Sequence, residues 1–263
     1  MVCHKDVFKN LELYRKFLEN IPLDKFREEY IKVKWVEQDL PKEILPLASI
    51  FRNYWDEMNL LDFEDWFENF WGELHQNEER LLALKNFKKY YFDKNNDGWF
   101  KLGFKARMYR TWVSVLTQLD FCYVFVYVSD KQNKNLKLEA NAELDRKGID
   151  ARVGDIDFQV AKISQRKEAR PGVSGKKKKI TIPYAVFNIN EFKRKSRSSS
   201  VKQDNRRKYK KAIEAFFKYF KILPNGFVVF SEYYVSEIVK NIHDAQALKV
   251  IVDKILLELS GEY

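Results

Sequence analysis

The segment 142-AELDRKGIDARVGDIDFQVAK-162 is the most informative part of the chain, because apolar residues recur in it at every second position. The alternation runs through residues 149–153 and again through 156–160, on either side of Gly154-Asp155. Period-two alternation is typical of half-buried strands, and a two-residue connection containing glycine is typical of a tight hairpin. The segment therefore predicts a β-hairpin with one apolar and one polar face.

The register of this hairpin brings acidic and amide side chains together. A two-residue loop pairs Val153 with Ile156 and places Asp150 opposite Gln159 on the polar face. Directly opposed residues have Cβ atoms roughly 5 Å apart, so both side chains can bind one cation. Asp145, expected at the end of the preceding strand, can reach the same place. Such oxygen ligands suit Mg²⁺, which prefers a few carboxylates together with water and phosphate oxygens.

The same polar face has a simpler interpretation. Arg152 lies opposite Asp157 in this register, so the face could be an ordinary surface held by an ion pair. The geometry of the hairpin favours the two interpretations equally.

Outward from the hairpin, the pattern predicts an α/β fold. Residues 1–130 have apolar residues at helical spacing and form a mainly helical portion. Residues 131–263 form the second portion, expected to be continuous with the first. A mixed sheet is predicted from about 134 to 189, with residues 136–143 as a strand that leads into the hairpin.

The later part of the chain supplies further elements to this sheet and around it. Pro183 moves the strand predicted at 180–189 towards a sheet edge. Residues 226–231, which include the apolar run FVVF at 227–230, are expected to extend the sheet. Helices are predicted at 203–220, 233–242 and 244–259, and the Ser-rich residues 193–202 are predicted to form a mobile loop.

Bulk composition excludes several classes of protein. Two cysteines and three widely separated histidines argue against a disulfide framework and against a Cys/His zinc site. The N-terminal residues are too charged for a secretory signal. The longest apolar run, residues 121–128, is too short to span a bilayer. We therefore expect a soluble cytoplasmic protein without a membrane partner.

Positive charge is concentrated in one stretch of the chain. Residues 161–211 contain 18 Lys and Arg against 3 acids, a net charge of +15, while the whole chain carries +10. A local positive field of this kind suits a polyanion such as nucleic acid. The alternative is a solvated charged surface without a ligand.

Several segments resemble TaqI-type restriction endonucleases, in the same order along the chain. These segments are VEQDLP at 36–41, ARMYRTW at 106–112, AELDRKGID at 142–150, FQVAK at 158–162 and NGFVVF at 225–230. The resemblance implies a nuclease core of the PD-(D/E)XK kind, in which two acids and a lysine serve metal-dependent DNA cleavage. The helical N-terminal portion would pack on the mixed sheet of this core.

The resemblance also implies roles for single residues. Asp145 and Asp150 match the two catalytic aspartates, and Gln159 begins the family's Gln-x-Lys-Lys element. The first lysine of that element is replaced by Ala161. Lys162 is therefore the candidate catalytic lysine, although regular alternation puts it on the apolar face unless a bulge or the strand end turns it over. Lys167 is the other candidate.

The expected function follows from these assignments. The chain would be a type II restriction endonuclease that uses Mg²⁺, held by Asp145, Asp150 and Gln159, to cut double-stranded DNA at a short palindrome, with TCGA implied by the resemblance. A homodimer would match the two-fold symmetry of such a site. The residues expected to contact DNA are Arg166, Lys167, Arg170, Lys176, Lys177, Lys178 and Lys179. The alternatives are a non-catalytic nucleic-acid-binding protein and a nuclease for structured DNA.

Overall fold

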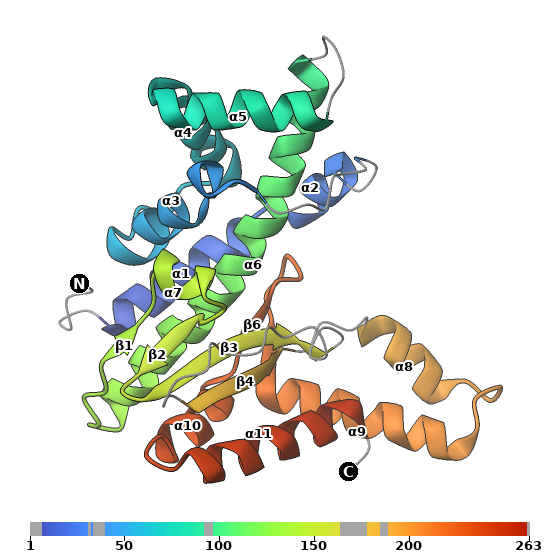
Figure 1. Ribbon diagram of the computed structural model, residues 1–263. Coiled ribbons are helices and arrows are strands. Elements are labelled where there is room, and N and C mark those ends of the chain that lie inside the picture. The colour runs from blue at the N-terminus through green and yellow to red at the C-terminus, as the bar shows by residue number, and fades with distance from the viewer. Residues whose placement is uncertain are drawn as a thin grey trace.

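The computed structural model describes residues 7–30, 33, 40–91, 97–163, 178–184 and 189–261. It has the expected α/β fold, in which helices surround a four-stranded mixed sheet (Figure 1). The strands are β1 (Leu138–Glu139), β2 (Ala151–Val153), β3 (Ile156–Lys162) and β4 (Lys178–Tyr184), in the order β1-β2-β3-β4. The first three are antiparallel, and β4 runs parallel to β3.

The hairpin register is as expected. Val153 pairs with Ile156, Arg152 with Asp157 and Ala151 with Phe158. Gly154 has a φ of 55°, a conformation that glycine adopts without steric cost. Strand β4 lies at the edge of the sheet, where Pro183 costs no ladder hydrogen bond to a further strand.

Long helix α6 (Asp97–Lys131) positions the sheet. It joins the predicted helix at 107–119 and the apolar run at 121–128 into one element, and the rings of Phe121 and Phe125 lie 5.7 and 6.1 Å from that of Phe158 on β3. By length and composition α6 could cross a membrane, but 67% of its most apolar window is buried inside the protein. Its apolar surface is therefore explained by packing against the other helices and the sheet.

The remaining N-terminal helices pack along the length of α6 and against one another (Figure 1). They are α1 (Val7–Asn20), α2 (Leu23–Tyr30), α3 (Leu47–Phe51), α4 (Phe63–Gln76) and α5 (Glu78–Tyr91), with a 3-10 turn at Lys42–Ile44 and a π turn at Arg52–Asp56. The aromatic residues of 63–71 lie mostly in this core, where Phe63, Trp66, Phe67 and Phe70 are fully buried.

The C-terminal elements cover the β4 side of the molecule (Figure 1). They are α8 (Ile189–Arg197), α9 (Gln203–Tyr219), β5 (Phe220–Ile222), β6 (Val228–Phe230), α10 (Glu232–Lys240) and α11 (Ala245–Ser260). Strands β5 and β6 pair only with each other, so the expected extension of the main sheet by residues 226–231 is wrong. Asn225 anchors their turn by donating to the carbonyls of Leu18 and Ile21.

Two further expectations about elements are corrected. The strand predicted at 136–143 shrinks to two residues, because Asn141 accepts a hydrogen bond from Leu144 N–H (3.0 Å) and starts the short helix α7 (Ala142–Arg146). The mobile loop predicted at 193–202 is helical up to Arg197, with Lys195 and Glu191 forming an i,i+4 ion pair. Of the strand predicted at 180–189, residues 180–184 lie in β4, residues 185–188 lie outside the described residues, and Ile189 begins α8.

Candidate active site

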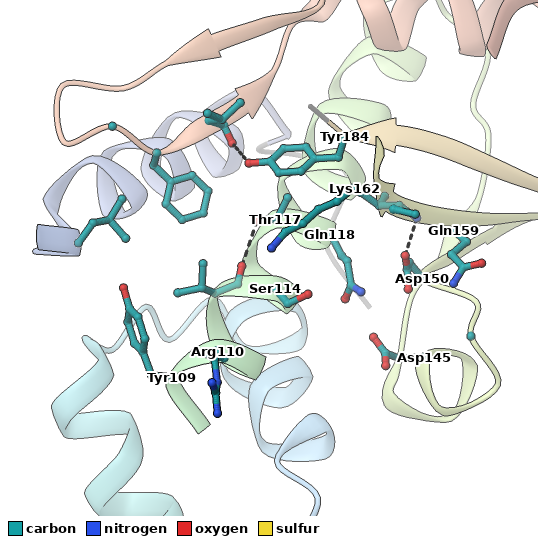
Figure 2. Close-up of a pocket in the computed structure, with 18 of the residues that line it drawn as sticks. Tyr109, Arg110, Ser114, Thr117, Gln118, Asp145, Asp150, Gln159, Lys162 and Tyr184 are labelled. Atoms are coloured by element: carbon teal, nitrogen blue, oxygen red, sulfur yellow. Dashed lines mark hydrogen bonds between the residues drawn. The ribbon is translucent and has the colours of Figure 1, made fainter. Parts of the chain in front are cut away.

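A cavity of about 760 Å³ opens between α6, the end of β3 and the turn between β5 and β6 (Figure 2). It brings together residues from six elements and the turns between them. Its lining includes Tyr109, Arg110, Ser114, Thr117, Gln118, Asp145, Asp150, Gln159, Lys162 and Tyr184. All four catalytic candidates from the sequence therefore line one cavity.

Asp150 lies at the innermost part of this group and is only 4% exposed. Its N–H donates to the Phe158 carbonyl (2.8 Å), although Phe158 already pairs with Ala151, so two residues oppose one as in a β-bulge. Asp150 thus does not pair with Gln159 as expected. One carboxylate oxygen, Oδ2, instead accepts a hydrogen bond from Val160 N–H at 2.5 Å.

Burial dominates the electrostatics of Asp150. Burial and the neighbouring Asp145 raise the pKa of Asp150 well above its ordinary value, while Val160 N–H and the charge of Lys179 act in the opposite direction. No Lys or Arg within the described ranges forms an ion pair with it. A buried carboxylate is costly unless it is protonated or compensated, and a divalent ion would compensate both acids at once.

Asp145 reaches the cavity from an unexpected element. It lies on α7, half-buried, and not at the end of a strand. Figure 2 shows its carboxylate directed towards the part of the cavity that holds Asp150 and Gln118. The short helix therefore does what the sequence argument assigned to a strand end: it brings a second acid next to Asp150.

Gln159 supplies an amide next to the two acids. Its Oε1 is buried and has no hydrogen-bond partner in the part of the chain that the structure describes. A buried oxygen of this kind is costly when it has no donor or cation to contact. The donor set of two carboxylates and one amide fits a hard divalent ion. Among the described residues, no group of three or more His, Cys, Asp or Glu could hold a metal.

Lys162 enters the cavity without a distortion of its strand. It is the last residue of β3, pairs in regular register with Tyr184, and shares a face with Phe158 and Val160. From the sequence, the site was expected on the opposite, polar face of the hairpin. The cavity opens on the α6 side, so the apolar face itself becomes the cavity wall, and Lys162 points into it (Figure 2).

The ion pair proposed as the simpler interpretation is also present. Arg152 Nε lies 2.5 Å from Asp157 Oδ1, and the Asp157 side chain is 9% exposed. This pair ties β2 to β3 but includes neither Asp145 nor Asp150. The hairpin therefore carries a structural ion pair and, separately, the two acids of the cavity.

Most of the expected DNA contacts cannot be compared with the structure. Arg166, Lys167, Arg170, Lys176 and Lys177 lie outside the described residues. Lys178 begins β4, and Lys179 follows it, close enough to Asp150 for its charge to lower the pKa of that acid.

Helices α8 and α9 pack against each other and carry the other described cations of the basic stretch. Lys193, Arg194 and Arg197 line a second hollow, and the cations Arg207, Lys208, Lys210 and Lys211 of α9 are exposed. Sequence reasoning left these residues unassigned because it treated the first part of this region as a loop. An exposed basic surface of this kind is suited to phosphate groups.

Sequence reasoning also missed the α6 wall of the cavity. Arg110, Ser114 and Gln118 follow one another at i, i+4 and i+8 and all line the cavity. This i, i+4, i+8 spacing puts the three polar residues on one face of the helix, which is a detectable signal. It did not stand out because the helix lies more than twenty residues before the acids in sequence.

An α/β fold with two acids, an amide and a lysine around one cavity, close to a strongly basic surface, is the arrangement typical of nucleases. The chain belongs to the TaqI restriction endonuclease family, whose model matches residues 11–242. It is 34% identical to the type II restriction enzyme TaqI of Thermus aquaticus and 33% identical to TthHB8I of Thermus thermophilus. Each match covers 88% of this chain and 87% of the relative. No solved structure matches the chain.

The family decides between the enzyme and the non-catalytic binding protein. Both relatives are type II restriction enzymes by name, and the match extends over most of the chain. The protein is therefore a site-specific deoxyribonuclease.

Proposed function

We propose that this nuclease uses Mg²⁺ to cut both strands of duplex DNA at a short palindrome, TCGA, and that the cavity beside Asp150 is its active site. The observation that carries the proposal is the burial of Asp150 next to Asp145, with one backbone N–H as its hydrogen-bond donor. The sheet β1–β4 would then be a PD-(D/E)XK core. We expect such an enzyme to act in the cytoplasm.

The side chains around the cavity would have different roles in phosphodiester hydrolysis. Asp145, Asp150 and Gln159 would hold the divalent ion, which supplies a polarised phosphoryl oxygen and a more acidic water when bound. In the reaction a water oxygen bonds to phosphorus, the P–O3′ bond breaks, and the 3′ oxygen takes a proton. The products are a 5′-phosphate and a 3′-hydroxyl.

Lys162 is the residue we assign to charge stabilisation. Its amino group is exposed at the cavity mouth, and no described acid pairs with it. A lysine in this place can offset the negative charge that builds on the phosphoryl oxygens in the transition state. Lys167 remains the alternative, and the two are compared by mutation below.

The DNA backbone would lie across the basic stretch and the mouth of the cavity. The residues Arg166, Lys167, Arg170 and Lys176–Lys179 are proposed as phosphate contacts, with the exposed cations of α8 and α9 beyond them. Each phosphate contact releases counterions, so affinity should fall steeply with salt. Replacing Lys176–Lys179 with Ala should flatten that dependence.

Symmetric cutting of a palindrome requires two active centres. Each chain has one set of Asp145, Asp150 and Gln159, so a two-fold homodimer would present one centre to each strand. Two chains per cognate duplex in light scattering, and linear product without a long-lived nicked stage, are the expected results.

The proposal is tested by incubating the protein with plasmid DNA and Mg²⁺ and separating the products on a gel. Discrete fragments whose ends map to TCGA are expected, and EDTA should stop the reaction. Discrete fragments with other ends would show that the enzyme recognises a sequence other than TCGA. A smear would indicate a nuclease without site specificity, and full cleavage after exhaustive dialysis into EDTA would exclude the metal.

A further inference from the structure

Gln118 on α6 has a feature that none of the assigned roles explains. Its Oε1 is buried and has no hydrogen-bond partner among the residues that the structure describes. Unsatisfied buried oxygens are rare, because each one loses its contacts with water and gains none in return. A polar atom left in this state calls for a ligand or a water that satisfies it.

The position of Gln118 indicates which ligand. It lines the same cavity as Asp145 and Asp150. It also lines a separate hollow beside this cavity, and Asp145 lines that hollow too. Figure 2 shows the amide directed from α6 towards these two acids, opposite the wall that carries Gln159. The unsatisfied oxygens of Gln118 and Gln159 thus lie on opposite sides of a pair of carboxylates.

We propose that Gln118 is a residue of the metal centre, whose Oε1 contacts the hydrated divalent cation held by the two acids. This inference rests on the proposed function, because it assumes that the acids bind a cation. An amide oxygen is a hard, neutral ligand, so it satisfies a cation or its water without adding the repulsion that a third carboxylate would add. The contact would join α6 to the sheet across the cavity.

The alternative role for Gln118 is purely structural. A structural amide in the core would have partners within the protein, and its loss would lower the stability of the fold. Gln118 has no such partner for its oxygen in the described chain. The apolar substitution Gln118→Leu should therefore leave the melting temperature in EDTA unchanged or higher.

Titration with Mn²⁺, followed by the electron paramagnetic resonance of the unbound ion, tests the inference without DNA cleavage. Gln118→Leu should weaken Mn²⁺ binding by about ten-fold. Gln118→Glu keeps the oxygens and loses the amide donor, so its affinity should equal or exceed that of the wild type. Gln76→Leu, the same change at an exposed position of α4, should have no effect.

The same titration separates failure of this inference from failure of the proposed function. Asp150→Asn should lose Mn²⁺ binding altogether. If Asp150→Asn loses binding while Gln118→Leu binds like the wild type, only the role of Gln118 is overturned. If Asp150→Asn also binds normally, the metal centre itself is misplaced. Equal losses in Gln118→Leu and Gln118→Glu would show that the amide donor matters, which also overturns the inference.

Discussion

Two buried aspartates, Asp120 and Asp150, have different environments in this protein. Asp120 on α6 is completely buried, yet it accepts hydrogen bonds from Arg15 Nε (3.3 Å) and from Phe230 N–H (2.7 Å). Arg15 also donates to the Phe230 carbonyl, so α1, α6 and β6 are tied at one point. The fold itself supplies the cation that this carboxylate requires.

Asp150 is nearly as buried but has a different environment. Its hydrogen-bond donor is a backbone N–H, and after burial the largest effect on its pKa comes from another acid, Asp145, which raises it. A buried charge must be compensated within the protein or by something that binds to it. The comparison teaches that burial alone does not identify a functional acid; the absence of an ion pair with any described Lys or Arg distinguishes Asp150 from Asp120.

The largest expected effect is on cleavage by Asp150→Asn. Because this change removes a charged ligand of the proposed metal centre, the single-turnover rate should fall by at least about 1000-fold. The affinity for noncognate duplex should equal that of the wild type, since the basic surface is unchanged. Asp155→Asn, the same change at the exposed turn of this hairpin, is the matched control. If Asp150→Asn cleaves DNA at the wild-type rate, Asp150 is not a metal ligand of the active site, and it does not differ from Asp120 in this respect.

The second prediction concerns Asp120. Asp120→Ala leaves Arg15 without its buried partner and should lower the free energy of unfolding by about 3–5 kcal/mol. The measurement is urea unfolding, with the cleavage rate of the folded protein as the second readout. That rate should remain within a few-fold of the wild type. A loss of cleavage without a loss of stability would assign Asp120 to the active site.

The third prediction compares the two lysines, Lys162 and Lys167, that could stabilise the negative charge of the transition state. Lys162→Ala should reduce the single-turnover rate by about 100-fold, because Lys162 points into the cavity. Lys167→Ala should have a smaller effect, mainly on DNA affinity. The reverse order would place the active-site lysine on the segment that follows β3.

The smallest expected effect is a pH dependence of stability without metal. The folded state raises the pKa of Asp150, so folding binds this proton more tightly than the unfolded chain does. Stability should therefore fall as the pH rises from the ordinary aspartate range, near 4, through the elevated folded pKa. In EDTA at neutral pH, Asp150→Asn should melt about 2–4 °C above the wild type.

Two controls sharpen this last comparison. The difference in melting temperature between Asp150→Asn and the wild type should vanish at the acidic end, where both side chains are uncharged. It should also shrink when Mg²⁺ stabilises the wild type alone. A variant that melts below the wild type at neutral pH would mean that the Asp150 carboxylate is compensated within the folded chain.

Much of the site could be predicted because its residues are close in sequence. Asp150, Gln159 and Lys162 lie on one hairpin, whose alternation and Gly154-Asp155 turn determine the pairing. The details that failed depend on single contacts. The Asn141 cap converts a predicted strand into α7, and the bulge at Asp150 moves its carboxylate to Val160 N–H. Hydropathy patterns do not detect a cap or a bulge, because neither changes the order of apolar and polar residues.

The sequence by itself determined the hairpin, the acids and the basic stretch, since period-two alternation and charge are local properties that require no knowledge of the rest of the chain. Tertiary structure alone decided which face of β3 becomes the site. Packing of α6 through Phe121 and Phe125 places the cavity on the side of Lys162 and brings Gln118 to the acids from thirty residues away. The burial of Asp150 likewise depends on that packing, whereas the buried Asp120 receives its cation from Arg15, 105 positions earlier.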